Sequence, residues 1–366
     1  MTDVDPAEVG LDPKQLRRLD AHLRRYVEER KLAGCQVMVS RRGKVAHLAS
    51  LGAADLEAGR AVAPDTLWRI YSMTKPVTSV AAMMLWEEGA FELTDPVSRW
   101  LPEFASPRVY TGGTAARPVT VPATEPLRVW HLLTHTAGLT YGFHKVHVTD
   151  ELHRLRGFEL GAPPGMDLAA CVRAWAEIPL AFQPGAEWNY SVATDVLGRF
   201  IEVVSGQSLD TFFAERIFRP LGMSDTAFWC PEDKQDRLAA LYTLSPGTGQ
   251  VVRLDSVGKA ALRPPTWLSG GGGLVSSTRD FTRFTWMLLN GGELDGVRLL
   301  SPRTIDYMTV NHLPGGADLS EFGRPLFAET RFDGVGFGLG FATTTAVHKT
   351  MVAGNNGDYF WGGAAS

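Results

Sequence analysis

The chain has 366 residues, of which 45% are hydrophobic and 21% charged, and its formal net charge at pH 7 is -4. This balance is typical of a soluble globular protein and gives no general electrostatic reason to expect nucleic acid or an anionic membrane as a partner. Residues 1–6 are acidic and polar, unlike the basic start and apolar run of a signal peptide. The longest apolar run, residues 80–86, is far shorter than the ~20 residues that span a bilayer. We therefore expect a cytoplasmic protein.

The N-terminal part predicts a helix followed by a hairpin. Residues 12–31 predict an amphipathic helix packed on a sheet, because apolar residues recur there at three- and four-residue steps: Leu16, Leu19, Leu23 and Val27. Residues 35–40 and 44–49 are short strand-like runs, and the Arg-Arg-Gly sequence between them indicates a turn.

A second helix is predicted from about Ser72 to Gly89, where glycine can adopt the left-handed conformation of a helix C-terminus. Pro76 has no N–H and fits only in a first turn, so this helix must begin near Ser72. Three cysteines are widely separated and form no C-x-x-C pattern: Cys35, Cys171 and Cys230. We interpret them as buried free thiols, and a cysteine nucleophile is the alternative.

From about residue 93 to residue 244 helices alternate with loops rich in Pro and Gly, and residues 278–290 and 335–344 predict a helix and a hairpin. Strands near both ends around a helical middle indicate an α/β plus all-α fold, an antiparallel sheet flanked by helices with a large helical insertion. We expect a sheet domain of residues 1–80 and 265–366, a mainly helical domain of residues 81–264, and an active site at their junction.

Ser72 and Lys75 are three residues apart at the predicted start of a helix and so share one helix face. A serine hydroxyl becomes a good nucleophile only with a base within hydrogen-bond reach, and the S-x-x-K pattern supplies one locally. The same spacing recurs at Ser256 and Lys259, where an internal glycine and later prolines disfavour a helix start. The first pair therefore predicts a serine hydrolase that forms an acyl-enzyme.

Five segments occur in a fixed order along nearly the whole chain: Ser72–Lys75, Leu132–Leu139, Tyr190-Ser191, Gly270–Leu274 and Trp361–Gly363. In this order they resemble the serine β-lactamase-like carboxylesterases, the family VIII esterases, which share the fold of class C β-lactamases and penicillin-binding proteins. The resemblance implies that Ser72 is the nucleophile and that Lys75 and Tyr190 share proton transfer, with no metal and no cofactor. It also implies an oxyanion hole made by the backbone N–H groups of Ser72 and Ala364.

The resemblance places the small-molecule substrate against five residues: Trp361, Gly362, Gly363, Ser191 and Val192. Class C β-lactamases have asparagine where this chain has Val192, and Lys-Thr-Gly where it has Trp-Gly-Gly, so polar groups that hold a β-lactam are replaced by apolar ones. We therefore expect hydrolysis of short-chain carboxylic esters through an acyl-Ser72 intermediate. The alternatives are β-lactamase or peptidoglycan DD-peptidase activity, acyl transfer to an alcohol, and a non-catalytic binding protein of the same fold.

Other patterns have structural interpretations. His131 and His135 are four residues apart, but the Glu of H-E-x-x-H and a third ligand at zinc-site spacing are missing. The Gly270–Gly273 run lacks the lysine of a phosphate-binding loop and indicates close packing. Lys349-Thr350 is followed by Met351 where the family has glycine, and we interpret it as a solvated strand end. The G-x-S-x-G pentapeptide of α/β-hydrolases occurs nowhere in the sequence.

The family continues beyond the Trp-Gly-Gly segment with a further strand and a C-terminal helix, whereas this sequence ends at Ser366. We expect these two elements to be missing here, which would leave an unpaired strand edge and uncovered apolar surface.

Overall fold

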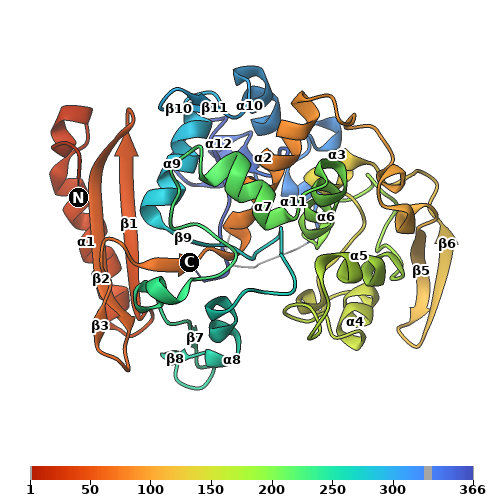
Figure 1. The fold of residues 1–366 in the computed structure, drawn as a ribbon, viewed down its shortest axis with the longest axis horizontal. Coiled ribbons are helices and arrows are strands. Elements are labelled where there is room, and N and C mark those ends of the chain that lie inside the picture. The colour runs from red at the N-terminus through yellow and green to blue at the C-terminus, as the bar shows by residue number, and fades with distance from the viewer. Residues whose placement is uncertain (1, 325–331, 366) are drawn as a thin grey trace.

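The computed structural model describes residues 2–324 and 332–365. Figure 1 shows α1 and the β1–β2–β3 sheet at one end of the molecule, the β5–β6 hairpin and helices α4 and α5 at the other, and α2 between them. Antiparallel sheets combined with a helical middle confirm the predicted fold class. Among the described residues, no helix is both long enough and apolar enough to cross a membrane.

The strands pair in small antiparallel sheets, with the orders β1-β2-β3, β12-β13-β14, β4-β9, β5-β6, β7-β8 and β10-β11. Their bounds are β1 (Gly34–Arg41), β2 (Lys44–Asp55), β3 (Arg60–Ala61), β4 (Leu67–Arg69), β5 (Arg108–Thr114), β6 (Arg117–Pro122), β7 (Tyr242–Leu244), β8 (Val251–Arg253), β9 (Val275–Ser277), β10 (Glu293–Leu294), β11 (Val297–Arg298), β12 (Val335–Phe337), β13 (Ala342–Thr344) and β14 (Tyr359–Phe360).

The helices lie between and around these sheets (Figure 1). Their bounds are α1 (Pro13–Glu28), α2 (Thr74–Glu87), α3 (Val129–Leu133), α4 (Val148–Leu155), α5 (Leu168–Ala176), α6 (Ala193–Ser205), α7 (Leu209–Phe213), α8 (Asp255–Gly258), α9 (Thr278–Leu289), α10 (Pro302–Thr309), α11 (Leu319–Phe322) and α12 (Val347–Thr350).

Several local predictions are confirmed. Helix α1 covers the predicted amphipathic segment and packs on β2 and β1, and Asp12 caps it by accepting the Lys14 N–H. The β1–β2 and β12–β13 hairpins and helix α9 also lie where the sequence placed them. Gly89, just beyond α2, has a φ of 74°, the left-handed conformation expected of glycine at a helix end.

Other predictions are wrong in detail. Instead of one sheet of N- and C-terminal strands, β1–β2–β3 and β12–β13–β14 are separate sheets within the described residues, where the short β4–β9 pair is the only strand pairing between the two regions. The β5–β6 hairpin falls inside the segment predicted to be helices and loops. The expected domain division remains a prediction, but a boundary at residue 80 would cut through α2.

Helix α2 is the centre of the main hydrophobic core. Every residue from Thr74 to Leu85 is buried, so the helix reaches solvent only at its last two residues. It packs against α6 and α7. The start of α2 is therefore a rigid position from which to present side chains.

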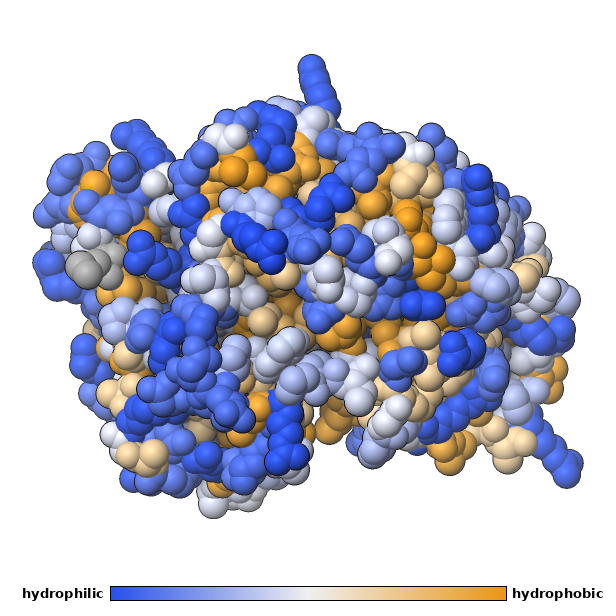
Figure 2. Space-filling model, in the orientation of Figure 1, coloured by the Kyte–Doolittle hydropathy of each residue, from blue (hydrophilic) through white to orange (hydrophobic). Residues whose placement is uncertain are grey.

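On the face in Figure 2, hydrophilic residues form most of the surface and hydrophobic residues show mainly between them.

Candidate active site

Ser72 lies in a tight turn between β4 and α2. The turn is a single 3-10 turn, Tyr71–Met73, so α2 begins at Thr74, two residues later than predicted. Tyr71 has a φ of 42°, a left-handed conformation that costs a residue with a side chain roughly 1–2 kcal/mol. The Ile70 N–H donates to the Leu274 carbonyl at 3.0 Å, which ties the turn to the residue just before β9. This strained turn directs the strand into the helix at the serine.

The structure brings Ser72, Lys75 and Tyr190 together. Ser72 Oγ lies 2.5 Å from the Tyr190 hydroxyl, which donates to it, and 3.3 Å from Lys75 Nζ. The Tyr190 contact is short enough for direct proton transfer, since general bases act at about 2.6–3.2 Å, and the Lys75 contact lies just beyond that range. Tyr190 comes from the segment just before α6, 118 residues further along the chain, so tertiary packing and not sequence spacing creates this contact.

The amine of Lys75 is buried and fully surrounded. The side chain is 2% exposed, and besides Ser72 it donates to the Tyr141 hydroxyl at 3.1 Å and to the Gly271 carbonyl at 2.7 Å. These contacts account for the three N–H donors of an ammonium group. Nζ also lies 4.4 Å from the centroid of the Tyr190 ring, a favourable position for a cation over an aromatic face.

Tyr141 and Asp195 extend this network, and the sequence did not reveal either of them. The Tyr141 hydroxyl is hydrogen-bonded to Asp195, and burial raises its pKa well above the ordinary value, with a further increase from the carboxylate of Asp195. Asp195 is 1% exposed and also accepts from Ser269 Oγ at 2.6 Å and the Gly271 N–H at 3.1 Å. Burial raises the pKa of Asp195, while Lys75 and these donors oppose the increase. A carboxylate thus reaches the lysine through one neutral tyrosine.

The glycine run fits closely against this network, as the sequence indicated. A Cβ on Gly271 would lie 2.5 Å from Asp195 Oδ2 and 3.0 Å from the Tyr141 hydroxyl oxygen, and one on Gly270 would lie 2.8 Å from the Thr194 carbonyl. Real Cβ atoms do not approach other atoms so closely, so glycine is needed to bring the Gly271 carbonyl to Lys75.

The Trp361–Gly363 segment passes beside the turn that carries Ser72. A Cβ on Gly363 would lie 2.5 Å from the Ile70 carbonyl oxygen, and the Trp361 ring centroid is 5.4 Å from that of Tyr190. Strand β14 ends at Phe360, so these residues directly follow the strand. Ala364 is exposed. The roles of the Ser72 and Ala364 N–H groups as oxyanion donors remain predictions.

Ser191 and Val192 are buried beside Tyr190, and their contact with substrate remains a prediction. They are 0% and 3% exposed, and Ser191 Oγ lies 3.2 Å from His135 Nδ1. Val192 immediately precedes α6 and packs in the main core. Both residues support the segment that positions Tyr190.

The other patterns take part in packing. His131 Nδ1 accepts the Arg128 N–H at 3.0 Å, and burial lowers the pKa of His131 to about 4. His135 is buried beside Ser191, as described above, and burial lowers its pKa too. Lys259 of the second S-x-x-K pattern pairs with Asp255 at 3.0 Å.

Lys349 lies in the short helix α12 and not at a strand end, which corrects its predicted position. Its ammonium group is 3.4 Å from Oδ2 of the buried Asp318, so this carboxylate accounts for its charge.

Comparisons with known proteins agree with this geometry. A model of the family described as Beta-lactamase matches residues 19–365. Protein Rv1367c of Mycobacterium tuberculosis is 36% identical over 348 residues, covering 94% of this chain and 84% of that protein, and Esterase EstB of Burkholderia gladioli is 35% identical over 300 residues, covering 76% and 72%. The solved structure of EstCE1, described as a hydrolase with promiscuous acyltransferase activity, matches with a TM-score of 0.77 and 29% identity, covering 95% of this chain and 87% of EstCE1.

Proposed function

This chain belongs to the beta-lactamase family, as a serine hydrolase of that fold, and within it we propose that the protein is a carboxylesterase for short-chain acyl esters. The observation that carries the proposal is the position of Ser72 Oγ, within hydrogen-bond reach of both the Tyr190 hydroxyl and the Lys75 amine. The name of its relative EstB, an esterase, supports the same class of substrate.

The reaction proceeds in two half-reactions. In the first, the Tyr190–Lys75 pair starts with one proton removed and takes the proton of Ser72 as Oγ attacks the ester carbonyl. The pair then gives that proton to the leaving oxygen, so an alcohol departs and acyl-Ser72 remains. In the second, water attacks the acyl carbon and gives its proton to the same pair, which protonates Ser72 Oγ as the acid is released. The backbone N–H groups of Ser72 and Ala364 stabilise the oxyanion, about 3 kcal/mol for each donor.

The surroundings of the serine favour an ester over a β-lactam. Trp361 stands where β-lactamases carry Lys-Thr-Gly, and its ring packs with Tyr190 and Phe337, both at 5.4 Å between centroids. Val192 replaces an amide side chain with an apolar one that is buried in the core. The site therefore has an aromatic wall suited to an acyl or alkoxy group, and it lacks these two polar elements of β-lactam recognition.

Acyl transfer to an alcohol is the second candidate. EstCE1, whose fold this chain shares with a TM-score of 0.77, is described as having this promiscuous activity. Both reactions use the same acyl-Ser72 and differ only in whether water or an alcohol attacks it. The arrangement of Ser72, Lys75 and Tyr190 within hydrogen-bond distance argues against a non-catalytic protein of this fold.

A panel of chromogenic acetate, butyrate and octanoate esters and the β-lactam nitrocefin tests the proposal with wild-type protein, Ser72→Ala and the control Ser256→Ala from the second S-x-x-K pattern. We expect turnover of the short esters to exceed that of nitrocefin, and Ser72→Ala to reduce it at least 10³-fold, the scale of a lost nucleophile. Ser256→Ala should behave as wild type. Equal activity of wild type and Ser72→Ala would refute the proposal, and faster turnover of nitrocefin would identify a β-lactamase instead.

A further inference from the structure

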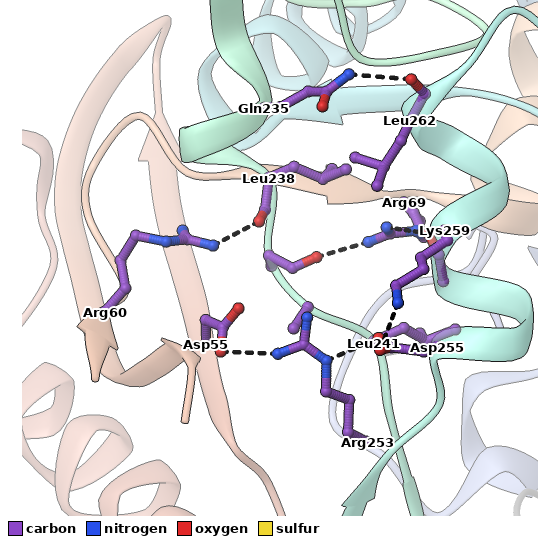
Figure 3. A pocket seen from close by; sticks show the side chains of 13 residues that line it. Asp55, Arg60, Arg69, Gln235, Leu238, Leu241, Arg253, Asp255, Lys259 and Leu262 are labelled. Carbon is purple, nitrogen blue, oxygen red and sulfur yellow. Dashed lines mark hydrogen bonds and ion pairs between the residues drawn. The ribbon is translucent and has the colours of Figure 1, made fainter. Parts of the chain in front are cut away.

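A cavity of about 210 Å³, whose lining does not include Ser72, lies between the end of the β2–β3 sheet and the segments around β8 and α8 (Figure 3). Its lining includes the cationic side chains of Arg60, Arg69, Arg253 and Lys259. The cavity is smaller than the roughly 300–1,000 Å³ of pockets for drug-sized ligands, so only a small ligand fits.

The carboxylates of this cavity are already paired. Arg253 donates to Asp55 at 2.9 Å, to Glu57 at 3.2 Å and to Asp255 at 2.7 Å, so one guanidinium contacts three acidic side chains. Lys259 shares Asp255 at 3.0 Å. The acidic groups near the cavity thus form ion pairs with Arg253 and Lys259, as the dashed lines in Figure 3 show for Asp55 and Asp255.

In the part of the chain that the structure describes, Arg60 and Arg69 instead bind only backbone carbonyls. Arg60 Nη2 donates to the Leu238 carbonyl at 2.7 Å, and Arg69 donates from Nη1 to the Ala239 carbonyl at 2.6 Å and from Nη2 to the Gly258 carbonyl. Within residues 2–324 and 332–365 neither forms an ion pair with a carboxylate, although Asp55 acts on Arg60 and Asp255 on Arg69 from a longer distance. Two guanidinium groups therefore line one cavity without a counter-charge in contact.

Of the two arginines, Arg69 has the greater need for an anionic partner. Its Nε atom is buried and has no hydrogen-bond partner among the described residues, and burial lowers the pKa of its guanidinium. An unpaired buried charge costs several kcal/mol, and an anion in contact with it reduces that cost. Guanidinium groups bind phosphate and carboxylate oxygens through two parallel N–H donors, and their preference is strongest where both charges are removed from bulk water.

We propose that this cavity binds a small oxyanion, a phosphate group, through Arg60 and Arg69. A doubly charged phosphate supplies two negative charges to two unpaired guanidinium groups, whereas a carboxylate supplies one. The volume admits the phosphate group of inorganic phosphate or of a small phosphate monoester. Arg69 is the last residue of β4 and lies three residues before Ser72, so the bound anion stabilises the strand that leads to the nucleophile.

Thermal unfolding measured against inorganic phosphate, at constant ionic strength maintained with sodium chloride, tests this site. We expect a saturable rise in Tm of a few degrees, because a ligand that binds only the folded state stabilises it by mass action. Arg60→Gln should raise the phosphate concentration for the half-maximal shift at least tenfold. The matched control Arg303→Gln, on the exposed surface of α10, should leave it unchanged.

Two further arms keep the test decisive. Arg69→Gln removes the charge, and Arg69→Lys replaces it if that variant fails to fold. Arg69→Lys preserves the charge but not the paired donors, so it should weaken the phosphate shift at least threefold. Glycerol phosphate in place of inorganic phosphate separates the two sources of the group, and a shift with either one supports the site. A Tm that does not rise with phosphate beyond the chloride-matched buffer, or that rises equally in Arg60→Gln, would show that both arginines only brace the loops.

Discussion

At the scale of single residues, the central feature is the buried Lys75, which one tyrosine separates from the carboxylate that balances its charge. Lys75 is 2% exposed, and Asp195 reaches it through the Tyr141 hydroxyl, which lies 3.1 Å from Nζ. A buried charge is stable only when it is paired and hydrogen-bonded. Tyr141 and Asp195 therefore position the amine toward Ser72, and they need no contact with the substrate to affect the rate.

Tyr141→Phe and Asp195→Asn test this positioning role. Each change should lower kcat about tenfold or more, equivalent to about 1.4 kcal/mol, with a smaller effect on KM. The double variant should lose little beyond the larger single loss, because both residues act through one network. The measurement is steady-state hydrolysis of a short-chain ester, with Tyr26→Phe on the remote helix α1 as control. Fully additive losses in kcat would contradict a shared network.

At the scale of elements, the site depends on close approach between α2, α6 and the glycine run before β9. Helix α2 packs against α6, and Gly270 lies where a side chain would meet the Thr194 carbonyl of α6 at 2.8 Å. The β4–β9 pair holds the two chain segments in register, with Arg69 opposite Val275. The elements on both sides of Ser72 are therefore fixed by backbone contacts. A small displacement of the glycine run would move the Gly271 carbonyl that binds Lys75.

Gly271→Ala tests this dependence. The added Cβ would lie 2.5 Å from Asp195 Oδ2, so we expect the free energy of unfolding to fall by about 1–3 kcal/mol and kcat to fall with it. Gly247→Ala is a matched control, because a Cβ there would meet nothing within 4 Å. Chemical denaturation and ester hydrolysis measure the two effects. If Gly271→Ala had the same stability and kcat as Gly247→Ala, the close fit around Gly271 would have no importance.

At the scale of the whole molecule, buried histidines link stability to pH. Burial lowers the pKa values of His131, His144 and His153 to about 4, from an unfolded value of about 6.5. The unfolded state therefore binds more protons between these pH values. Stability is fully present above pH 6.5 and falls as the pH decreases toward 4. Asp195 and Asp280, whose pKa values are raised, oppose this trend in part.

As the pH falls from 7 to 5, we expect each of these three histidines to lower the free energy of unfolding by about 2 kcal/mol. This is a large part of a total free energy of unfolding near 5–15 kcal/mol. Urea denaturation at half-unit steps across this range measures the slope. His153→Gln removes one of the three buried imidazoles and should reduce the slope by roughly a third. His22→Gln, on α1, serves as control. An unchanged slope in His153→Gln would mean that other groups control acid stability.

Local patterns predicted much of this molecule, and contacts between distant segments account for what they missed. Helix α1 and the β1–β2 hairpin follow from spacing and turn residues, and Ser72 and Lys75 are only three residues apart. The β5–β6 hairpin was missed because its valines, Val119 and Val121, are exposed and its strands include prolines and glycines. Tyr141 and Asp195 meet Lys75 only through tertiary packing, and no motif marked them.

The central claim is that Ser72 carries the acyl group, and mass spectrometry of the trapped enzyme tests it most directly. A fluorophosphonate or a slowly deacylating ester is added to wild type and Ser72→Ala, and the modified peptide is then identified. We predict one adduct per chain, located on Ser72 and absent from Ser72→Ala. An adduct on another residue that accumulates during ester turnover, or ester turnover by Ser72→Ala at the wild-type rate, would contradict the account.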